Sequence, residues 1–184
     1  MSRTRRINAA NKRRHERIHR KFGPLLMRTG EPLRLLVPPL EMVAFRFTMT
    51  RPMFYDRQNQ PLEWDEFAVL HSFRSYCRVD EATIGPLWIS TVWLGHDMGY
   101  GAGLGDRLAA GEWTPIVFET MVFRTPGEED IHPELEAYVE AIVRYESEEE
   151  ALAGHAAVCV DIRQTMAKID MAREVLNEAL NRKA

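Results

Sequence analysis

The chain has 184 residues, of which 45% are hydrophobic and 28% are charged, so it is not a wholly disordered or low-complexity polypeptide. It contains no apolar run of about 18 residues, which excludes a membrane-spanning helix. The basic N-terminus has no apolar run behind it, so we expect no secretory signal. The two cysteines, Cys77 and Cys159, form neither a CxxC motif nor a metal-spaced group with histidine, which predicts two buried thiols in a reducing compartment.

The net charge of −3 conceals a strong asymmetry. Residues 1–23 hold nine basic residues and one acid, Glu16, which gives +8 there and leaves −11 for the rest of the chain. A basic arm on an acidic body is typical of interaction with a partner. The arm is either a disordered solubilising tail or, as we favour, a segment that orders on phosphate or on an acidic protein. The candidate nucleic-acid-binding residues are Arg3, Arg5, Arg6, Lys12, Arg13, Arg14, Arg17, Arg20 and Lys21.

Residues 24–52 contain five prolines, which exclude a long helix and predict an extended segment lying on a surface. Within it, the alternation in MVAFRFTMT (42–50) predicts one strand.

A compact α+β body is expected over residues 53–146. After a turn at Gln58-Asn59-Gln60-Pro61, an amphipathic helix is expected in LEWDEFAVLHSFRSY, where Trp64, Phe67, Leu70 and His71 recur every three or four residues. Three strand-like runs follow, CRVDEATI, LWISTVWL and PIVFETMVF. The simplest arrangement is a small antiparallel β-meander with the helix on one face, and with Trp93 and Phe118 buried on its inner side.

The C-terminal third is predicted to be helical. HPELEAYVEAIVRY (132–145) is expected to form a short helix, and Ser147 with Glu150 forms a capping box that begins a long helix over 147–184. Two sets of residues recur at multiples of seven along it, broken by Arg173. They are Leu152, Cys159, Met166 and Leu180, and His155, Ile162, Ile169 and Leu176.

This heptad pattern has two interpretations. The helix either caps its own domain, or pairs with a second copy or another partner as a coiled coil. We expect His155 to be a core histidine. We expect the seam to be covered by another helix, from a second copy or from residues 134–145, because apolar side chains gain free energy on leaving water. The candidate oligomerisation residues are therefore Ile162, Met166, Ile169 and Leu176.

The stretch ISTVWLGHDMGYGAGLGD (89–106) raises the question of an active site. Its glycines follow the pattern GxGxGxG, which is not that of a phosphate-binding loop, and no lysine follows them. We interpret the loop with His96 and Asp97 as a connection between strands, and we predict no metal and no cofactor. Glu119 is the one acid within an apolar strand. It faces either solvent, as we favour, or a cleft with His96.

Four strings in the chain resemble a widespread family of small uncharacterised proteins of tailed phages and prophages. They are YDRQNQPLEWDEFAVL, VDEATIGPLWISTVWLG, PIVFETMVF and RYESEEEALAGH, and the resemblance covers roughly residues 53–160. That family typically has Asp-His where this chain has Asp97-Met98, and here the histidine, His96, precedes the aspartate. This displacement indicates a loop that tolerates rearrangement. The resemblance implies a phage origin and no particular chemistry.

We therefore predict a non-enzymatic phage or prophage accessory protein whose basic arm docks on nucleic acid or a nucleoprotein. The alternative is a virion structural or assembly component in which the arm and the C-terminal helix lace subunits together. A third hypothesis is an enzyme that uses the region of His96 and Glu119. The expected partners are nucleic acid and a second copy of the chain, without a membrane, and the expected location is the host cytoplasm or the virion.

Overall fold

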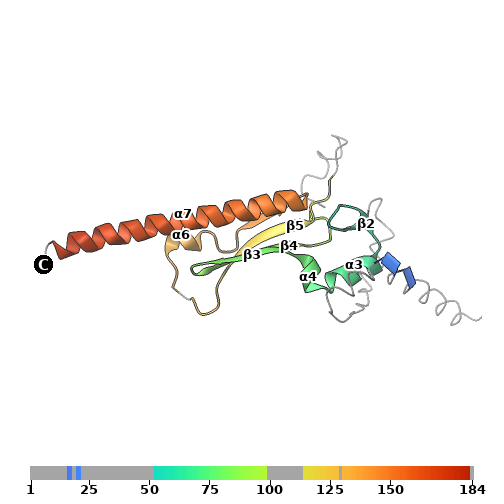
Figure 1. The fold of residues 1–184 in the computed structure, drawn as a ribbon, viewed down its shortest axis with the longest axis horizontal. Helices are drawn as coiled ribbons and strands as arrows, with labels where there is room; N and C mark the ends of the chain where they lie inside the picture. The colour runs from blue at the N-terminus through green and yellow to red at the C-terminus, as the bar shows by residue number, and fades with distance from the viewer. Residues whose placement is uncertain (1–15, 18–19, 22–51, 99–113, 129, 183–184) are drawn as a thin grey trace, which may run out of the picture.

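The computed structural model describes residues 16–17, 20–21, 52–98, 114–128 and 130–182. Residues 24–51 of the predicted proline-rich segment, with its strand over 42–50, and the glycine loop from Gly99 lie outside these residues. The described part is an α+β fold, as predicted: an antiparallel sheet is covered on one face by a long C-terminal helix (Figure 1). None of the helices in the described part is both long enough and apolar enough to cross a membrane.

The sheet is a meander in which every strand pairs with the next one in the sequence. Its order is β3 (Arg78–Ile84), β4 (Leu87–Trp93), β5 (Phe118–Arg124) and β6 (Ile142–Tyr145), all antiparallel. Gly85 has φ +54°, which glycine adopts without the steric cost of a side chain, and with Pro86 it forms the tight β3–β4 turn.

Strand β6 corrects the expectation of one helix over 132–145. Only Pro133–Glu136 form a helix, α6. Glu140 then takes a φ of +64° and donates its backbone N–H to the carbonyl of Val122, which leads the chain back to the sheet. The β-branched Ile142 and Val143 that follow suit an edge strand beside β5.

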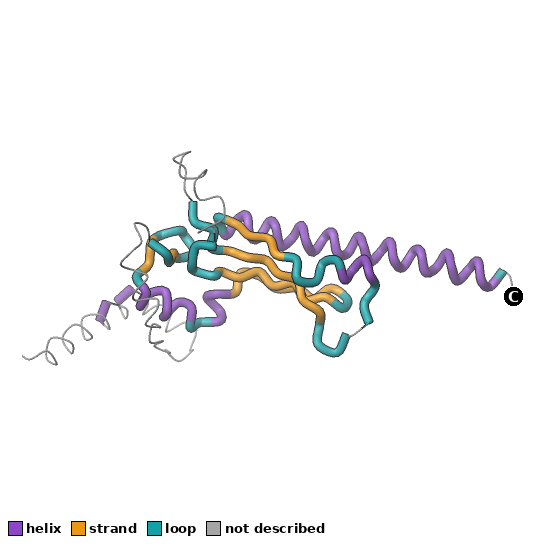
Figure 2. The backbone as a smooth tube through the Cα atoms, turned by 180° about the vertical axis from the view of Figure 1, so that it is seen from behind, coloured by secondary structure: helices purple, strands orange, loops and turns teal. Residues whose placement is uncertain are grey.

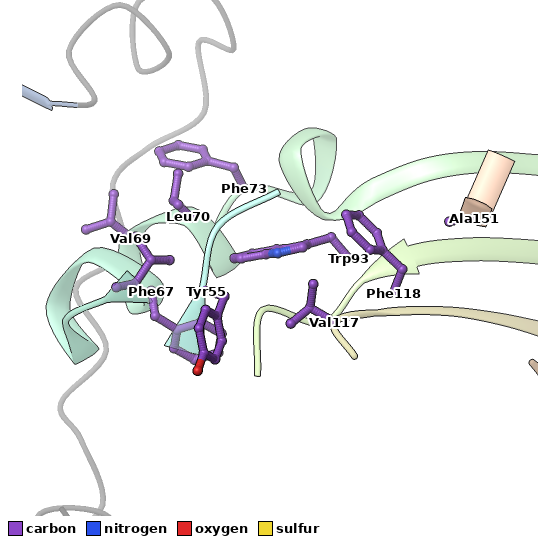
Figure 3. Close-up of a cluster of buried hydrophobic side chains, with 10 residues drawn as sticks. Tyr55, Phe67, Val69, Leu70, Phe73, Trp93, Val117, Phe118 and Ala151 are labelled. Carbon is purple, nitrogen blue, oxygen red and sulfur yellow. The ribbon is translucent and has the colours of Figure 1, made fainter. Parts of the chain in front are cut away.

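The inner face of the sheet is set by alternation along β4. Leu87, Ile89, Thr91 and Trp93 are buried, whereas the residues between them are half-buried. Trp93 lies opposite Phe118 in the β4–β5 pair, and both side chains are almost wholly buried, as predicted (Figure 3).

The predicted single helix after residue 62 is in fact two. They are α3 (Trp64–His71) and α4 (Arg74–Cys77), which are separated at Phe73, a fully buried side chain. Together with the short ribbon of β1 (Phe54–Tyr55) and β2 (Pro61–Leu62), α3 forms an aromatic cluster around the Trp93 end of the sheet (Figure 3). The helix that covers the sheet face is therefore α7 and not α3.

Helix α7 (Glu148–Asn181) begins at the predicted capping box. The Ser147 hydroxyl accepts from the Glu150 N–H at 3.2 Å, and the Glu150 carboxylate accepts from the Ser147 N–H at 3.3 Å. The helix packs along the sheet as far as Ile169 and then continues past the ends of the strands (Figures 1 and 2). Of the two interpretations of the heptad pattern, packing on its own domain holds for this first part.

Gly154 allows α7 to lie close to the sheet. A Cβ atom at this position would overlap the ring of Tyr145 on β6. The absence of a side chain at Gly154 thus sets the distance between the helix and the edge strand.

Candidate functional site

Three of the nine candidate nucleic-acid-binding residues lie in the described part of the arm, and two of them contact the chain's own body. Arg17 Nη2 lies 2.7 Å from Asp65 Oδ2, and Lys21 Nζ lies 3.3 Å from Glu66 Oε1. Arg20 is exposed. The other six, from Arg3 to Arg14, lie outside the described residues.

The acids that receive these bases are buried at the first turn of α3. Glu66 also accepts a hydrogen bond from the backbone N–H of Glu63 at 3.1 Å, so it caps α3 while it contacts the arm. Sequence reasoning did not single out Asp65 and Glu66. The signal that could have found them is a pair of adjacent acids between two aromatic core residues, Trp64 and Phe67. The arm is thereby anchored to the body at its C-terminal end.

Asp97, at the start of the glycine loop, makes structural contacts. Its carboxylate accepts the backbone N–H of Ile116 at 3.0 Å, and its own N–H donates to the carbonyl of Met53 at 3.1 Å. The Met98 N–H donates to the Ile116 carbonyl at 2.8 Å, and the Leu94 N–H donates to the Val117 carbonyl at the same distance. We refer to these bonds as the Asp97 clamp. They hold together the two strands that flank the loop, which supports its interpretation as a connection.

The histidine beside the clamp also has a structural contact. His96 Nδ1 lies 3.2 Å from the Leu94 carbonyl oxygen, and its backbone bridges to Phe54. Burial disfavours the charged form of the His71 imidazole on α3 and so lowers its pKa, and electrostatic repulsion from His96 lowers it further.

Glu119 lies on the outer side of the sheet, as favoured, but it is buried there and does not face open solvent. It lies on the sheet face opposite α7, is largely buried, and accepts from Arg144 Nε at 3.0 Å. The two residues are direct cross-strand partners on β5 and β6. The pairing explains how a carboxylate can be buried within an apolar strand.

A buried polar cluster joins the sheet to α7. The Thr91 hydroxyl lies 2.8 Å from His155 Nδ1 and 2.6 Å from the Thr120 hydroxyl. All three side chains are buried, so the prediction of a core histidine is confirmed. On its other side, His155 Nε2 lies 3.8 Å from Asp80 Oδ2, beyond hydrogen-bond distance. The cluster fixes the position of α7 over β4 and β5.

The two cysteines differ in their surroundings. Cys159 is buried on α7 and burial raises the pKa of its thiol, whereas Cys77 is only half-buried, which corrects the prediction of two buried thiols. Within the described residues, no group of three or more His, Cys, Asp or Glu side chains is placed to hold a metal ion.

The four candidate oligomerisation residues do not share one environment. Ile162 and Ile169 are buried in a core cluster with β4, β5 and Leu135 of α6, and Met166 is partly buried against it. Only Leu176 is exposed. The expectation that residues 134–145 cover part of the seam therefore holds for Ile162, Met166 and Ile169, because Leu135 of α6 packs in the same cluster, but the chain's own sheet covers them as well.

Comparisons with known proteins add no relative: no family model, no curated protein and no solved structure matches the chain.

Proposed function

We propose that the chain is a non-enzymatic accessory protein of a phage or prophage, whose basic arm binds nucleic acid or a nucleoprotein. The observation that carries the proposal is the charge of +8 within residues 1–23 on a remainder of −11. Because Arg17 and Lys21 pair with Asp65 and Glu66, we assign the phosphate contacts to the other seven basic residues of the arm. Each basic side chain that neutralises a phosphate releases a condensed counterion, and this release drives binding without any sequence preference.

The geometry at the base of the arm supports this role. Arg17 and Lys21 lie against Asp65 and Glu66, which anchors the arm at one end of the molecule, far from the C-terminal end of α7 (Figure 1). A polyanion attracted to the arm would then be kept away from much of the acidic body, which would otherwise repel it.

The side chains that the sequence offered for catalysis also support a non-enzymatic role. Asp97 holds the backbone of Ile116, Glu119 pairs with Arg144, and His96 Nδ1 lies 3.2 Å from the Leu94 carbonyl oxygen. Each contact engages a polar atom of the side chain within the fold.

The test compares two variants with the same loss of charge. The first variant has glutamine in place of Lys12, Arg13 and Arg14. The control has glutamine in place of three exposed bases on or directly after α7, Arg163, Lys168 and Arg182. Binding to fluorescent duplex DNA and to single-stranded RNA is measured by anisotropy over a range of salt. Log affinity against log salt should be less steep by up to about 2.7 for the arm variant on duplex DNA, at about 0.9 per phosphate contact.

Two results would overturn the proposal. The first is a wild-type chain that binds neither nucleic acid at low salt. The second is a salt slope that changes equally in the two variants, since binding would then follow net charge alone and not the arm.

A virion assembly component is the second candidate function, and the exposed apolar end of α7 favours it. Apolar side chains left in water on a helix are typical of a surface that another subunit covers. Mass spectrometry of purified virions distinguishes the two candidates. An assembly component is present in many copies per particle, whereas an accessory protein remains in the host cytoplasm.

A further inference from the structure

The last three turns of α7 form an exposed apolar surface. Within the described residues, α7 has no buried side chain after Ile169. Beyond it, Met171, Val175, Leu176 and Leu180 are 66%, 63%, 59% and 58% exposed. Figures 1 and 2 show from opposite sides that this part of the helix extends past the sheet. We refer to residues 170–181 as the tail.

The tail is amphipathic in its own right. At about 100° per residue, six apolar residues fall on one half of the helix: Met171, Ala172, Val175, Leu176, Ala179 and Leu180. All the other residues of the tail, which are polar or charged, fall on the other half. Such a division is typical of a helix that buries one side against a partner.

The apolar half continues the side of α7 that Tyr138 contacts further towards the N-terminus of the helix. The Tyr138 hydroxyl, just after α6, donates to Asp161 at 2.6 Å and lies 3.1 Å from the Thr165 hydroxyl. Ala172 follows Thr165 by seven residues and Ala179 follows by seven more, so all four positions lie along one side of the helix. A covering element beyond α6 would lie directly on the tail.

We propose that this element is the tail of a second copy, packed antiparallel about a two-fold axis between Val175 and Leu176. A two-fold interface must be self-complementary. The rotation places Ala172 of each copy opposite Ala179 of the other. Two small residues therefore meet at both of these contacts. It also brings Val175 and Leu176 of both copies together at the centre. The small residues let the helices approach closely while the large ones fill the space beside them.

The charges of this region favour a second copy over other occupants. The tail itself carries one base and three acids, and the flanking Lys168 and Arg182 bring residues 168–182 to a net charge of zero, although the chain outside the arm is strongly acidic. With these flanking bases, two copies of the region meet without net repulsion. An anionic membrane would instead select a helix rich in lysine and arginine.

The length of the tail sets the expected strength of the dimer. Twelve residues span about 18 Å, and so short a pair of helices buries less than the ~800 Å² per partner of a standard interface. We therefore expect a reversible dimer that forms in the micromolar range. The inference does not rest on the role proposed for the arm.

Sedimentation equilibrium on the full chain, up to about 200 μM, tests whether the dimer forms. Wild type should shift from monomer towards dimer mass with concentration. Val175→Glu combined with Leu176→Glu should weaken the dimer by at least about tenfold. The matched control is Leu152→Glu with Val160→Glu. These two apolar residues are 42% and 49% exposed and lie on the outer side of the part of α7 that packs on the sheet. The control should behave as wild type, and circular dichroism should show equal helix content, since glutamate is a good helix former.

Cysteine crosslinking tests the direction of pairing. A chain with Ala172→Cys is mixed with a chain with Ala179→Cys under mild oxidation, and wild type serves as the blank for Cys77 and Cys159. Antiparallel packing predicts a crosslinked dimer in the mixture and little with either chain alone.

Crosslinks of each variant with itself would overturn the antiparallel arrangement. A strict monomer at the highest concentration, or equal weakening by the control pair, would overturn the dimer. A monomer that sediments with phosphatidylcholine and phosphatidylglycerol vesicles would assign the tail to a lipid surface instead.

Discussion

Replacing Thr91 by valine tests whether the polar cluster under α7 stabilises the fold. Valine has nearly the shape of threonine, so the main loss is the hydroxyl that contacts both His155 and Thr120. A buried polar group left without a partner costs about 1–3 kcal/mol, so two groups together cost about 2–6 kcal/mol. The added methyl group returns about 0.8 kcal/mol. We therefore expect a net loss of at least about 1 kcal/mol from a total stability on the order of 5–15 kcal/mol.

Urea unfolding followed by tryptophan fluorescence measures this loss as a lower midpoint at an unchanged slope. Thr83→Val on β3 is the matched control, because Thr83 is exposed. A double-mutant cycle of Thr91→Val with His155→Leu should give a coupling of about 0.5–3 kcal/mol.

The reasoning would be refuted by a Thr91→Val chain within about 0.5 kcal/mol of wild type, the range of ordinary surface substitutions. It would equally be refuted by a Thr83→Val chain that loses as much.

Two further predictions concern α7. Gly154→Ala should lower the melting temperature because the new Cβ meets the Tyr145 ring, although alanine normally favours a helix by about 1 kcal/mol over glycine. Adding Tyr145→Ala should relieve that clash. A higher melting temperature for Gly154→Ala alone would show that the helix does not lie this close to β6. In the native chain, Cys159 should react with a thiol reagent more slowly than Cys77, because its burial and raised pKa leave less accessible thiolate. In urea the two thiols should react equally fast. Equal rates in the native chain would contradict the burial of Cys159 where α7 contacts the sheet.

Much of the sheet could be predicted because its signals are local. Alternation along Leu87–Trp93 and the Gly85-Pro86 turn fix a hairpin without reference to the rest of the chain. Strand β6 could not be found in this way. Its four residues follow a helix-like run, and only pairing with β5 makes them a strand.

The partners of surfaces and charges were harder to predict than the surfaces themselves. The heptad pattern shows which side of α7 is apolar but not whether its own sheet or another helix covers it, so Ile162 and Leu176 look alike in the sequence and differ in the fold. Likewise Arg17 and Asp65 are 48 residues apart, and no local pattern records that they meet.

Because of the Asp97 clamp, the strand register of the sheet does not depend on the length of the segment that joins β4 to β5. Trp93 already lies opposite Phe118, and Met98 is already bonded to Ile116, before any residue from 99 to 113 contributes. Closing a longer loop between fixed ends costs only about 0.6 kcal/mol per doubling of its length. This position therefore suits the grafting of a peptide epitope or a whole domain, which the sheet would carry without a change in strand pairing.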